Sequence, residues 1–259
     1  MSDSNTSRAT VVAAVVAVAA VILGVVLFQV LGDDGGDGEG AAVATAPETT
    51  QASPEASPSD AAQESPAAGE CTSPPPLPTS VPSFDEAPSQ DIAEDSVWKA
   101  TLTTSCGDIV LELFGDKAPQ TVSSFIFLAR EGYWKDSPCH RLVPQGIYVL
   151  QCGDPTGTGT GGPGYGYGIE NAPADGTYPR GTLAMARTQD PNSNGGQFFI
   201  VFEETALPVE GGGYSIFGEV VEGMDIVDAI AEAGVAGGAG DGAPAQPISI
   251  LDVTVEKKA

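Results

Sequence analysis

The chain contains few basic residues, and this excludes nucleic acids as partners. Its 259 residues hold 10 Lys and Arg against 35 Asp and Glu, so the net charge is −25. A protein that binds the phosphate backbone of DNA or RNA needs clustered Lys and Arg. The acidic residues are unevenly distributed, because residues 33–95 contain fourteen Asp and Glu and no Lys or Arg. We interpret this stretch as a solvated segment, with a specific acidic interaction tail as the alternative.

Patterns that bind metals are also missing. His140 is the only histidine, which excludes a histidine-rich metal site. The four cysteines, Cys71, Cys106, Cys139 and Cys152, lack the Cys-x-x-Cys spacing of zinc sites. Cys139 and His140 are neighbours in a predicted strand and point to opposite faces, so they do not form a nucleophile pair. The sequence therefore predicts neither a metal nor a cofactor.

Signatures of nucleotide binding and of hydrolases are absent as well. The glycine-rich stretch 157–168 is not followed by Gly-Lys-Ser/Thr or by the start of a helix, so it predicts a tight surface loop instead of a phosphate-binding loop. No nucleophile elbow occurs, and a single histidine gives no support to a hydrolase.

Residues 9–32 form a long uncharged run, ATVVAAVVAVAAVILGVVLFQVLG. As a helix rising about 1.5 Å per residue it would be about 35 Å long, which is enough to cross a bilayer. A cleaved signal peptide is the alternative, although its apolar region is usually shorter; the uniform apolarity disfavours a buried core helix. Because Arg8 is the only flanking basic residue, we expect a cytoplasmic tail at residues 1–8, a single transmembrane helix at 9–32 and an extracytoplasmic remainder.

Residues 33–95 are predicted to be a disordered linker. They are rich in Ala, Ser, Thr, Gly and acidic residues and include ten of the 21 prolines, so they cannot bury enough apolar surface to offset their ordering entropy. The run PPPLP at residues 74–78 is typical of polyproline II, which either acts as a stiff spacer or binds aromatic-lined grooves. Between an anchor and a domain, the spacer is favoured.

Residues 96–257 are predicted to fold as one mainly β domain. Alternating apolar and polar residues predict strands, and apolar residues spaced along one helical face predict helices. Many short strands with two helices favour a closed antiparallel barrel covered by helices. The predicted strands are 97–105, 109–114, 139–143, 147–152, 182–186, 198–202, 216–220 and 248–255, and the predicted helices run from Pro119 to about Gly132 and from Gly223 to Ala233.

Six motifs in this domain, which together cover about residues 97–256, resemble those of cyclophilins and follow the family's order. They are Ala118-Pro119-x-Thr121-Val122-x-x-Phe125, Cys139-His140-Arg141-Leu142-Val143, Gln151-Cys152-Gly153-Asp154-Pro155-Thr156-Gly157-Thr158-Gly159, Leu183-Ala184-Met185-Ala186, Asn192-Ser193-Asn194-Gly195-Gly196-Gln197-Phe198-Phe199-Ile200 and Phe217-Gly218-x-Val220. The resemblance implies a closed eight-stranded antiparallel barrel with two helices and an active groove on one outer face. It also implies peptidyl-prolyl cis/trans isomerase activity on proline-containing polypeptides, with no cofactor. With the apolar run, it suggests a membrane-anchored bacterial type that assists protein folding outside the cytoplasm.

Arg141 is the candidate catalytic residue. Rotation about an X–Pro bond faces a barrier of about 18–20 kcal/mol, because amide resonance is lost in the twisted state. A guanidinium is a permanent donor of fixed geometry that can stabilise this state in a site poor in water. The resemblance places Arg141 at the family's catalytic arginine, whereas an arbitrary arginine would more simply be a surface residue in a salt bridge.

The resemblance also supplies a substrate-binding set. It comprises Tyr148, Val149, Phe199, Leu207 and Tyr214 as the proline pocket, with Gln151, Ala186, Arg187 and Gln197 flanking it and holding the peptide backbone. Taken alone, Phe199 and Leu207 would be interpreted as ordinary core residues. Gln151 and Gln197 are more informative, since amides within apolar strands need hydrogen-bond partners.

The chain departs from the family's pattern at several of these positions. Cys139 replaces the usual Phe, and the turn between Arg141 and Gln151 is two residues longer than in many members. No Trp occurs near Leu207, and Tyr214 replaces a common His. These departures concern the details of the pocket and leave the arginine in place.

Two disulfide bonds are predicted, because the expected compartment is oxidising. Cys139 and Cys152 lie on the two arms of one predicted hairpin, and Cys71 would then pair with Cys106. Four cysteines allow three pairings, and buried free thiols are the alternative.

Two other functions compete with that of an isomerase. A domain of this kind could bind proline-containing segments with little turnover, or it could space other components at a cell surface. The presence of Arg141 and of an intact pocket set favours an enzyme, which we expect to be a monomer.

Overall fold

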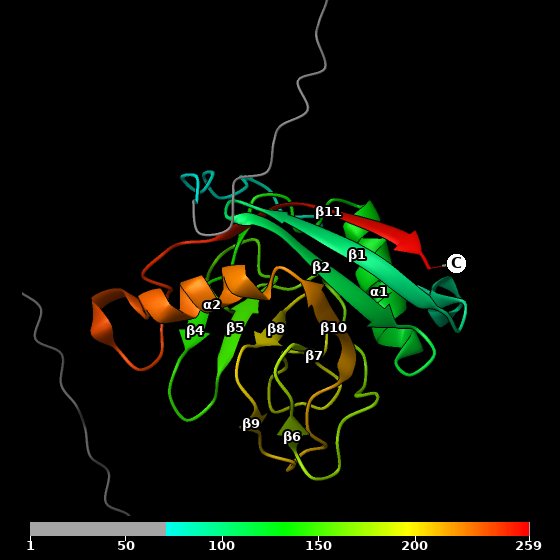
Figure 1. Ribbon diagram of the computed structural model, residues 1–259. Helices are drawn as coiled ribbons and strands as arrows, with labels where there is room; N and C mark the ends of the chain where they lie inside the picture. The colour runs from blue at the N-terminus through cyan, green and yellow to red at the C-terminus, as the bar shows by residue number, and fades with distance from the viewer. Residues whose placement is uncertain (1–70, 259) are drawn as a thin grey trace, which may run out of the picture. The chain divides into compact units, whose positions relative to one another are not determined.

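The computed structural model describes residues 71–258 of the chain (Figure 1). The predicted tail at 1–8 and the predicted membrane span at 9–32 lie outside the described residues, as does the linker as far as residue 70. Among the residues that are described, no helix has both the length and the apolar character needed to cross a membrane.

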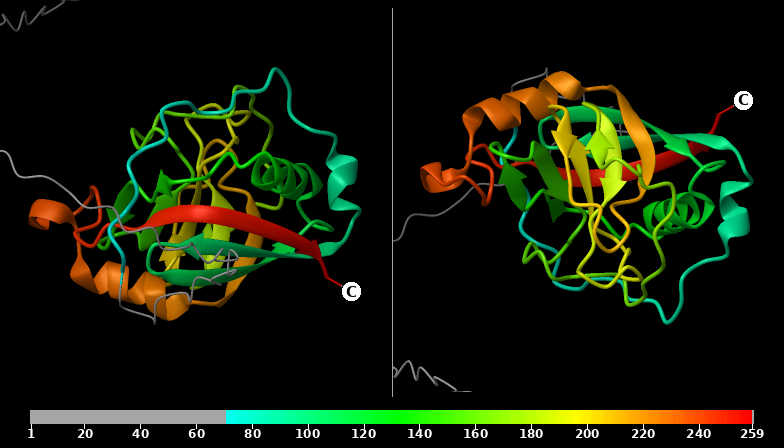
Figure 2. Two further views of the ribbon diagram at one scale, coloured as in Figure 1. Left: turned by 90° about the horizontal axis from the view of Figure 1, so that it is seen from above. Right: turned by 90° about the horizontal axis from the view of Figure 1, so that it is seen from below.

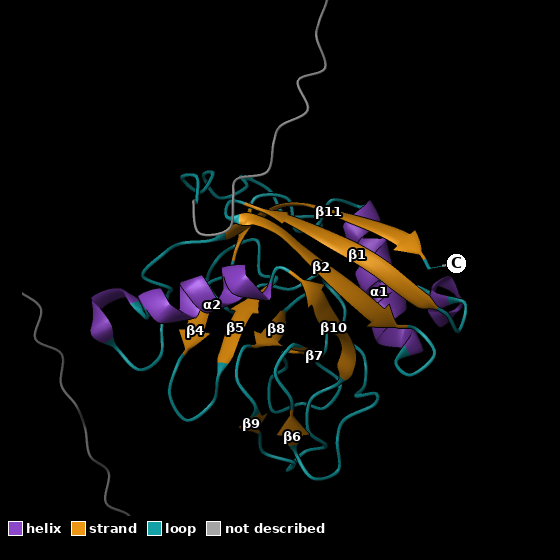
Figure 3. Ribbon diagram, viewed as in Figure 1, coloured by secondary structure: helices purple, strands orange, loops and turns teal. Residues whose placement is uncertain are grey.

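The described residues form a mainly β fold with two α-helices (Figure 3). The strands are β1 (Val97–Thr104), β2 (Gly107–Phe114), β3 (Ser137–Pro138), β4 (Arg141–Val143), β5 (Val149–Cys152), β6 (Thr177–Tyr178), β7 (Thr182–Met185), β8 (Phe198–Val201), β9 (Thr205–Ala206), β10 (Ile216–Glu222) and β11 (Ser249–Lys257). The helices are α1 (Pro119–Arg130) and α2 (Met224–Ala233), with two short 3₁₀ helices, η1 (Gln90–Ala93) and η2 (Ala236–Gly238). Each predicted strand and both predicted helices are confirmed, while β3, β6, β9 and the 3₁₀ helices were not expected.

The main sheet has nine strands in the order β3-β11-β1-β2-β10-β7-β8-β5-β4, and all neighbouring pairs are antiparallel. The sheet curls around the larger cluster of buried apolar side chains, which we call the main core. Helices α1 and α2 lie on opposite sides of this core (Figure 2). β6 and β9 form a separate two-stranded sheet.

The prediction of a closed eight-stranded barrel is wrong, because the sheet is a curled half-barrel of nine strands. Its two edge strands, β3 and β4, are separated in the chain only by Cys139 and His140, yet they are not paired with each other in the described sheet. The edge of β4 that would close the barrel is occupied instead by a loop. The Leu142 N–H donates to the Gly242 carbonyl at 2.7 Å, and the Gly242 N–H donates back at 3.2 Å.

Helix α1 begins with a proline and is capped from a distant loop. Pro119 occupies the first turn, where its missing N–H costs nothing. The carboxylate of Glu170 accepts hydrogen bonds from the N–H groups of Gln120 and Thr121, at 3.1 and 2.7 Å. A carboxylate at this end also complements the helix dipole. The buried side of α1 places Phe125 against Trp134 in the main core, with ring centres 4.6 Å apart.

Residues 71–95, which we call the N-terminal strap, differ from the predicted linker because they pack against the domain. Phe84 lies edge-on to Phe127 of α1 at 4.7 Å between ring centres, and Ala93 is fully buried. The Ala93 N–H donates to Ser123 Oγ at 2.9 Å. A few apolar side chains therefore suffice to order a segment whose average composition is polar, and its prolines reduce the entropy lost on ordering.

Both predicted disulfides are present. Cys71 is bonded to Cys106, 35 residues away, and Cys139 is bonded to Cys152; no described cysteine is free. The first bond joins the strap to the turn between β1 and β2. The second joins the segment between β3 and β4 to the end of β5.

We predict that Cys71→Ser lowers the free energy of unfolding by about 2–4 kcal/mol, because the disulfide closes a long loop in the unfolded chain. Thermal and urea denaturation of the full-length variant, measured without reductant, would show the loss. Cys71 itself is only partly buried, so a small packing loss is expected from the substitution. Equal stability of the variant and the oxidised wild type would show that the strap is held by its other contacts alone.

Candidate active site

The register of four neighbouring strands brings the candidate residues into one row. Arg141 on β4 is paired with Gln151 on β5, and Gln151 is paired with Phe199 on β8. Phe199 is in turn paired with Ala184 on β7. Directly paired residues of antiparallel strands project from the same face of a sheet. The guanidinium, the amide and the ring therefore stand side by side on the outer face.

Alternation along the same strands separates this outer face from the main core. Leu142, Leu150 and Ile200 point into the main core. The residues between them form a second apolar cluster on the outer face, with β6 and the segment around residue 214. This outer cluster comprises Val143, Val149, Tyr178, Ala184, Phe199 and Val201, with Ile147, Ala186, Leu207, Tyr214 and Ile216 packed against it.

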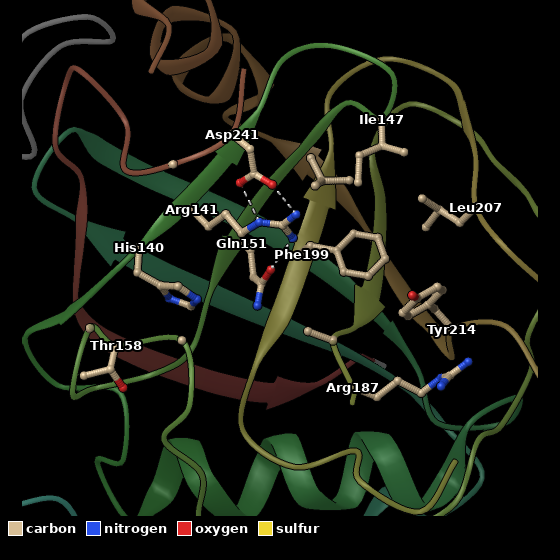
Figure 4. A pocket seen from close by; sticks show the side chains of 15 residues that line it. His140, Arg141, Ile147, Gln151, Thr158, Arg187, Phe199, Leu207, Tyr214 and Asp241 are labelled. Atoms are coloured by element: carbon tan, nitrogen blue, oxygen red, sulfur yellow. Dashed lines mark hydrogen bonds and ion pairs between the residues drawn. The ribbon is translucent and has the colours of Figure 1, made fainter. Parts of the chain in front are cut away.

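The outer cluster forms the floor of a pocket of about 460 Å³ (Figure 4). Its walls are polar on the side of β4 and apolar on the side of Leu207 and Tyr214. The lining residues are His140, Arg141, Ile147, Val149, Gln151, Gly157, Thr158, Gly159, Ala186, Arg187, Phe199, Leu207, Tyr214, Asp241 and Gly242. An apolar floor with a few convergent polar groups is typical of a binding site.

Arg141 stands at the centre of a hydrogen-bond network along the polar wall. Its Nε and Nη2 donate to the two carboxylate oxygens of Asp241 at 2.8 and 2.7 Å, and its Nη1 donates to Gln151 Oε1 at 3.1 Å (Figure 4). Gln151 Nε2 donates to Gln197 Oε1 at 2.9 Å, and Gln197 Nε2 donates to the Gly161 carbonyl at 2.9 Å. Both glutamines thus find the partners that their place in apolar strands required.

The ionisation states of this wall follow from these contacts. The hydrogen bonds from Arg141 hold the pKa of Asp241 below its usual value, and the same bonds raise the pKa of Arg141. Burial lowers the pKa of His140 and outweighs the opposing effect of Asp154. At neutral pH the pair is therefore ionised and the imidazole is neutral.

Arg187 holds the loop that carries Tyr214. Its Nε donates to the Gly213 carbonyl at 2.7 Å, and its Nη1 and Nη2 donate to the carbonyls of Thr188 and Glu210 at 2.8 and 3.3 Å. Its guanidinium carbon lies 4.9 Å from the centre of the Tyr214 ring. Three of the five N–H groups of Arg187 are thus bonded to backbone carbonyls, and these hydrogen bonds hold the part of the pocket wall that contains Tyr214.

The structure brings eight of the ten sequence-predicted site residues to the pocket: Arg141, Val149, Gln151, Ala186, Arg187, Phe199, Leu207 and Tyr214. Gln197 lines an adjoining hollow and contacts Gln151. Tyr148 does not line the pocket. It packs against the main core, with its ring 6.0 Å from that of Phe202, and Ile147 takes its place.

The displacement of Tyr148 has a simple physical reason. Val149 and Gln151 of β5 share the face of Arg141, because alternate residues of a strand project from the same face. Just before β5 the alternation continues, since Ile147 packs against the outer cluster and Tyr148 against the main core. The alternation was visible in the sequence and would have selected Ile147 directly.

Other pocket residues had no such signal. Asp241 lies one hundred residues from Arg141, in the connection between α2 and β11. Tyr178 is fully buried under the pocket, where its hydroxyl donates to the Tyr214 carbonyl at 3.0 Å and accepts from the Tyr214 N–H at 2.8 Å. Only the fold brings these residues to the site.

Residues 99–255 match the family model of the cyclophilin type peptidyl-prolyl cis-trans isomerases. The chain belongs to the cyclophilin family. The matched residues contain the pocket and its network, whereas the N-terminal strap lies outside them.

Relatives are found among bacterial proteins. The probable peptidyl-prolyl cis-trans isomerase B of Mycobacterium tuberculosis (strain ATCC 25618 / H37Rv) is 38% identical over 194 residues, which cover 69% of this chain and 60% of that protein. The peptidyl-prolyl cis-trans isomerase B of Escherichia coli (strain K12) is 39% identical over 167 residues, which cover 61% of this chain and 99% of that protein. The chain thus spans less than two thirds of the mycobacterial relative and nearly the whole of the other.

Solved structures share the fold. A cyclophilin type peptidyl-prolyl cis-trans isomerase of Cryptosporidium parvum is 31% identical, with a TM-score of 0.54, and the match covers 63% of this chain and 99% of that one. The same protein in the presence of the dipeptide Ala-Pro is 32% identical, with a TM-score of 0.53.

We predict that Ile147→Ala and Tyr148→Ala affect different properties, the first peptide binding and the second stability. Ile147→Ala removes apolar area from the pocket and should weaken the binding of a short X-Pro peptide about fivefold to tenfold, with little effect on stability. Tyr148→Ala should leave that affinity within about twofold and lower the free energy of unfolding by about 1–3 kcal/mol. Peptide titration and urea denaturation of both variants measure this. Weaker binding in the Tyr148 variant alone would contradict the arrangement.

Proposed function

We propose that this protein is a peptidyl-prolyl cis/trans isomerase that acts on X–Pro bonds of polypeptides. The observation that supports this function best is the position of Arg141, an ionised guanidinium fixed beside an apolar floor that can receive a proline ring. The names of the bacterial relatives point to the same activity.

The chemistry follows from the electronic structure of the amide. As the X–Pro bond twists, resonance is lost, and the prolyl nitrogen regains a lone pair that can accept a hydrogen bond. A donor that meets this nitrogen only in the twisted state stabilises the transition state more than the planar ground states. Arg141 retains two N–H groups beyond those bonded to Asp241 and Gln151, since a guanidinium has five.

The other pocket residues position the substrate. Phe199, Val149 and Leu207 offer the proline ring an apolar surface, and the ring of Tyr214 closes one side of it, 5.8 Å from the Phe199 ring. Gln151 stands between Arg141 and the floor, where it can hold the backbone next to the proline. No proton is transferred and no covalent intermediate is needed, so the work of the site is orientation and electrostatic stabilisation.

We predict that Arg141→Ala lowers kcat/KM for a short X-Pro peptide by about a hundredfold to a thousandfold, as expected for the loss of one well-placed charged donor. Arg141→Lys should restore only part of the activity, because an ammonium does not reproduce the planar donor fork. Isomerisation of the peptide by the full-length protein, followed by NMR exchange, measures both variants.

Arg130→Ala is the matched control, because Arg130 is exposed at the end of α1 and does not line the pocket. It should leave kcat/KM unchanged. Near-normal turnover by Arg141→Ala, at an unchanged melting temperature, would exclude the assigned mechanism. Peptide binding without any acceleration by the wild type would identify a binding module instead.

We further propose that the cyclophilin domain is held outside the cytoplasm by a membrane span at residues 9–32 and assists the folding of extracytoplasmic proteins there. The uncharged run and the single flanking Arg8 support this arrangement. Both disulfides are compatible with it, since such bonds persist in oxidising compartments.

This topology predicts that the full-length protein fractionates with the cell membrane and that protease added outside intact protoplasts releases the domain. Detection with an antibody against the domain would follow the release, and a cytoplasmic marker protein serves as the control for lysis. A domain that stays protected until the membrane is dissolved would reverse the topology.

A further inference from the structure

We propose that Asp241 is a positioning residue for Arg141, which holds the guanidinium in the orientation that the X–Pro bond requires. This inference rests on the proposed isomerase function and adds a residue that acts through Arg141. Asp241 lies on the rim of the pocket, opposite the apolar wall formed by Leu207 and Tyr214 (Figure 4).

Backbone contacts, not the ion pair, place Asp241 beside β4. Its neighbour Gly242 exchanges two hydrogen bonds with Leu142, the residue that follows Arg141. The connection is itself closed like a small hairpin, because the Ala236 N–H donates to the Ala243 carbonyl at 2.8 Å. A substitution of the Asp241 side chain should therefore leave the backbone in place.

The geometry of the pair restricts Arg141 strongly. Two parallel hydrogen bonds between a guanidinium and a carboxylate fix the plane of the guanidinium as well as its distance. Gln151 holds the third nitrogen, so three of the five N–H groups are used and two remain for a substrate. A long side chain that would otherwise sample several rotamers is thus oriented before the substrate arrives.

The effect of Asp241 extends along the polar wall. Because Gln151 Oε1 accepts from Arg141, the amide nitrogen of Gln151 is directed to Gln197 Oε1, and Gln197 in turn donates to the carbonyls of Gly159 and Gly161. Arg141 is the donor from which this chain starts, and the carboxylate of Asp241 accepts the two other N–H groups that hold the guanidinium in place. Loss of the Asp241 carboxylate would release the guanidinium of Arg141. It would thereby weaken the hydrogen bond from Arg141 that orients the amides of Gln151 and Gln197.

The ion pair between Arg141 and Asp241 is not explained by a contribution to the folding stability of the protein. The side chains of Arg141 and Asp241 are 38% and 51% exposed, and pairs as exposed as this contribute little to folding. A second exposed pair offers a matched comparison. Arg180 donates to both carboxylate oxygens of Asp228, at 2.6 and 2.7 Å, and neither residue lines the pocket.

The test compares Asp241→Asn with Asp228→Asn in the full-length protein. An amide keeps the size of the carboxylate but has an NH2 donor in place of one oxygen, so it cannot form the two parallel hydrogen bonds that Asp241 accepts. We expect Asp241→Asn to lower kcat about tenfold with KM within about twofold, because the orientation matters most in the twisted state. Asp228→Asn should leave both constants unchanged.

Two further measurements separate positioning from a general structural effect. In an Arg141→Lys background, Asp241→Asn should change kcat by less than about twofold, since the ammonium has no plane to orient. The 15Nε–1H resonance of Arg141 should shift and broaden in Asp241→Asn and remain unchanged in Asp228→Asn. Equal losses of activity in both Asn variants, or the full loss in the Lys background, would overturn the proposal.

A failure of the positioning role of Asp241 can be distinguished from a failure of the proposed isomerase function. If the wild type does not accelerate isomerisation, the isomerase assignment fails while the resonance of Arg141 still reports whether Asp241 orients it. If the wild type is active and Asp241→Asn is equally fast or faster, the isomerase assignment stands, and Asp241 is not a positioning residue.

Discussion

The hydrogen-bond register between β4, β5 and β8 is the constraint on which the site depends. It sets Arg141 opposite Gln151 and Gln151 opposite Phe199, so that charge, amide and ring project from one face. A shift of one residue in the pairing of one of these strands would turn the side chains of that strand from this face to the main core. The other face of the same strands is buried with α1 and α2, and that burial makes the register unambiguous.

The two edges of the curled sheet show how the chain stabilises an unclosed barrel. The free edge of β4 is paired with Gly242 and tied through Cys139 to Cys152 on β5. The N-terminal strap covers another part of the domain and is joined to it by the Cys71–Cys106 bond. The loop that replaces a closing strand is also the segment that carries Asp241. The opening of the barrel and the polar wall of the pocket are therefore products of the same connection.

Much of the fold and of the candidate site could be predicted from local patterns. The alternation in β1 and β2 and the apolar face of α1 each depend on nearby residues, and the structure confirms them. Three expectations failed where distant contacts decide. The barrel is not closed because a loop occupies the edge of β4. Residues 71–95 are ordered because Phe84 and Ala93 find partners on α1. Ile147 lines the pocket where Tyr148 was expected, because the motif alignment did not take account of the alternation of side chains along the strand.

The sequence by itself supplied the chemical groups of the site, since the resemblance of its motifs to those of cyclophilins singled out a guanidinium, two strand glutamines and a row of apolar residues. It favoured the pairing of Cys139 with Cys152 within one predicted hairpin, but it left other pairings and free thiols open, and the structure decided between them. Only the tertiary structure decided how the guanidinium is held. Asp241, Tyr178 and Arg187 act through contacts between segments that are far apart in the chain. Such contacts form only when the sheet curls and brings these segments together, so they cannot be predicted from the spacing or the periodicity of the residues.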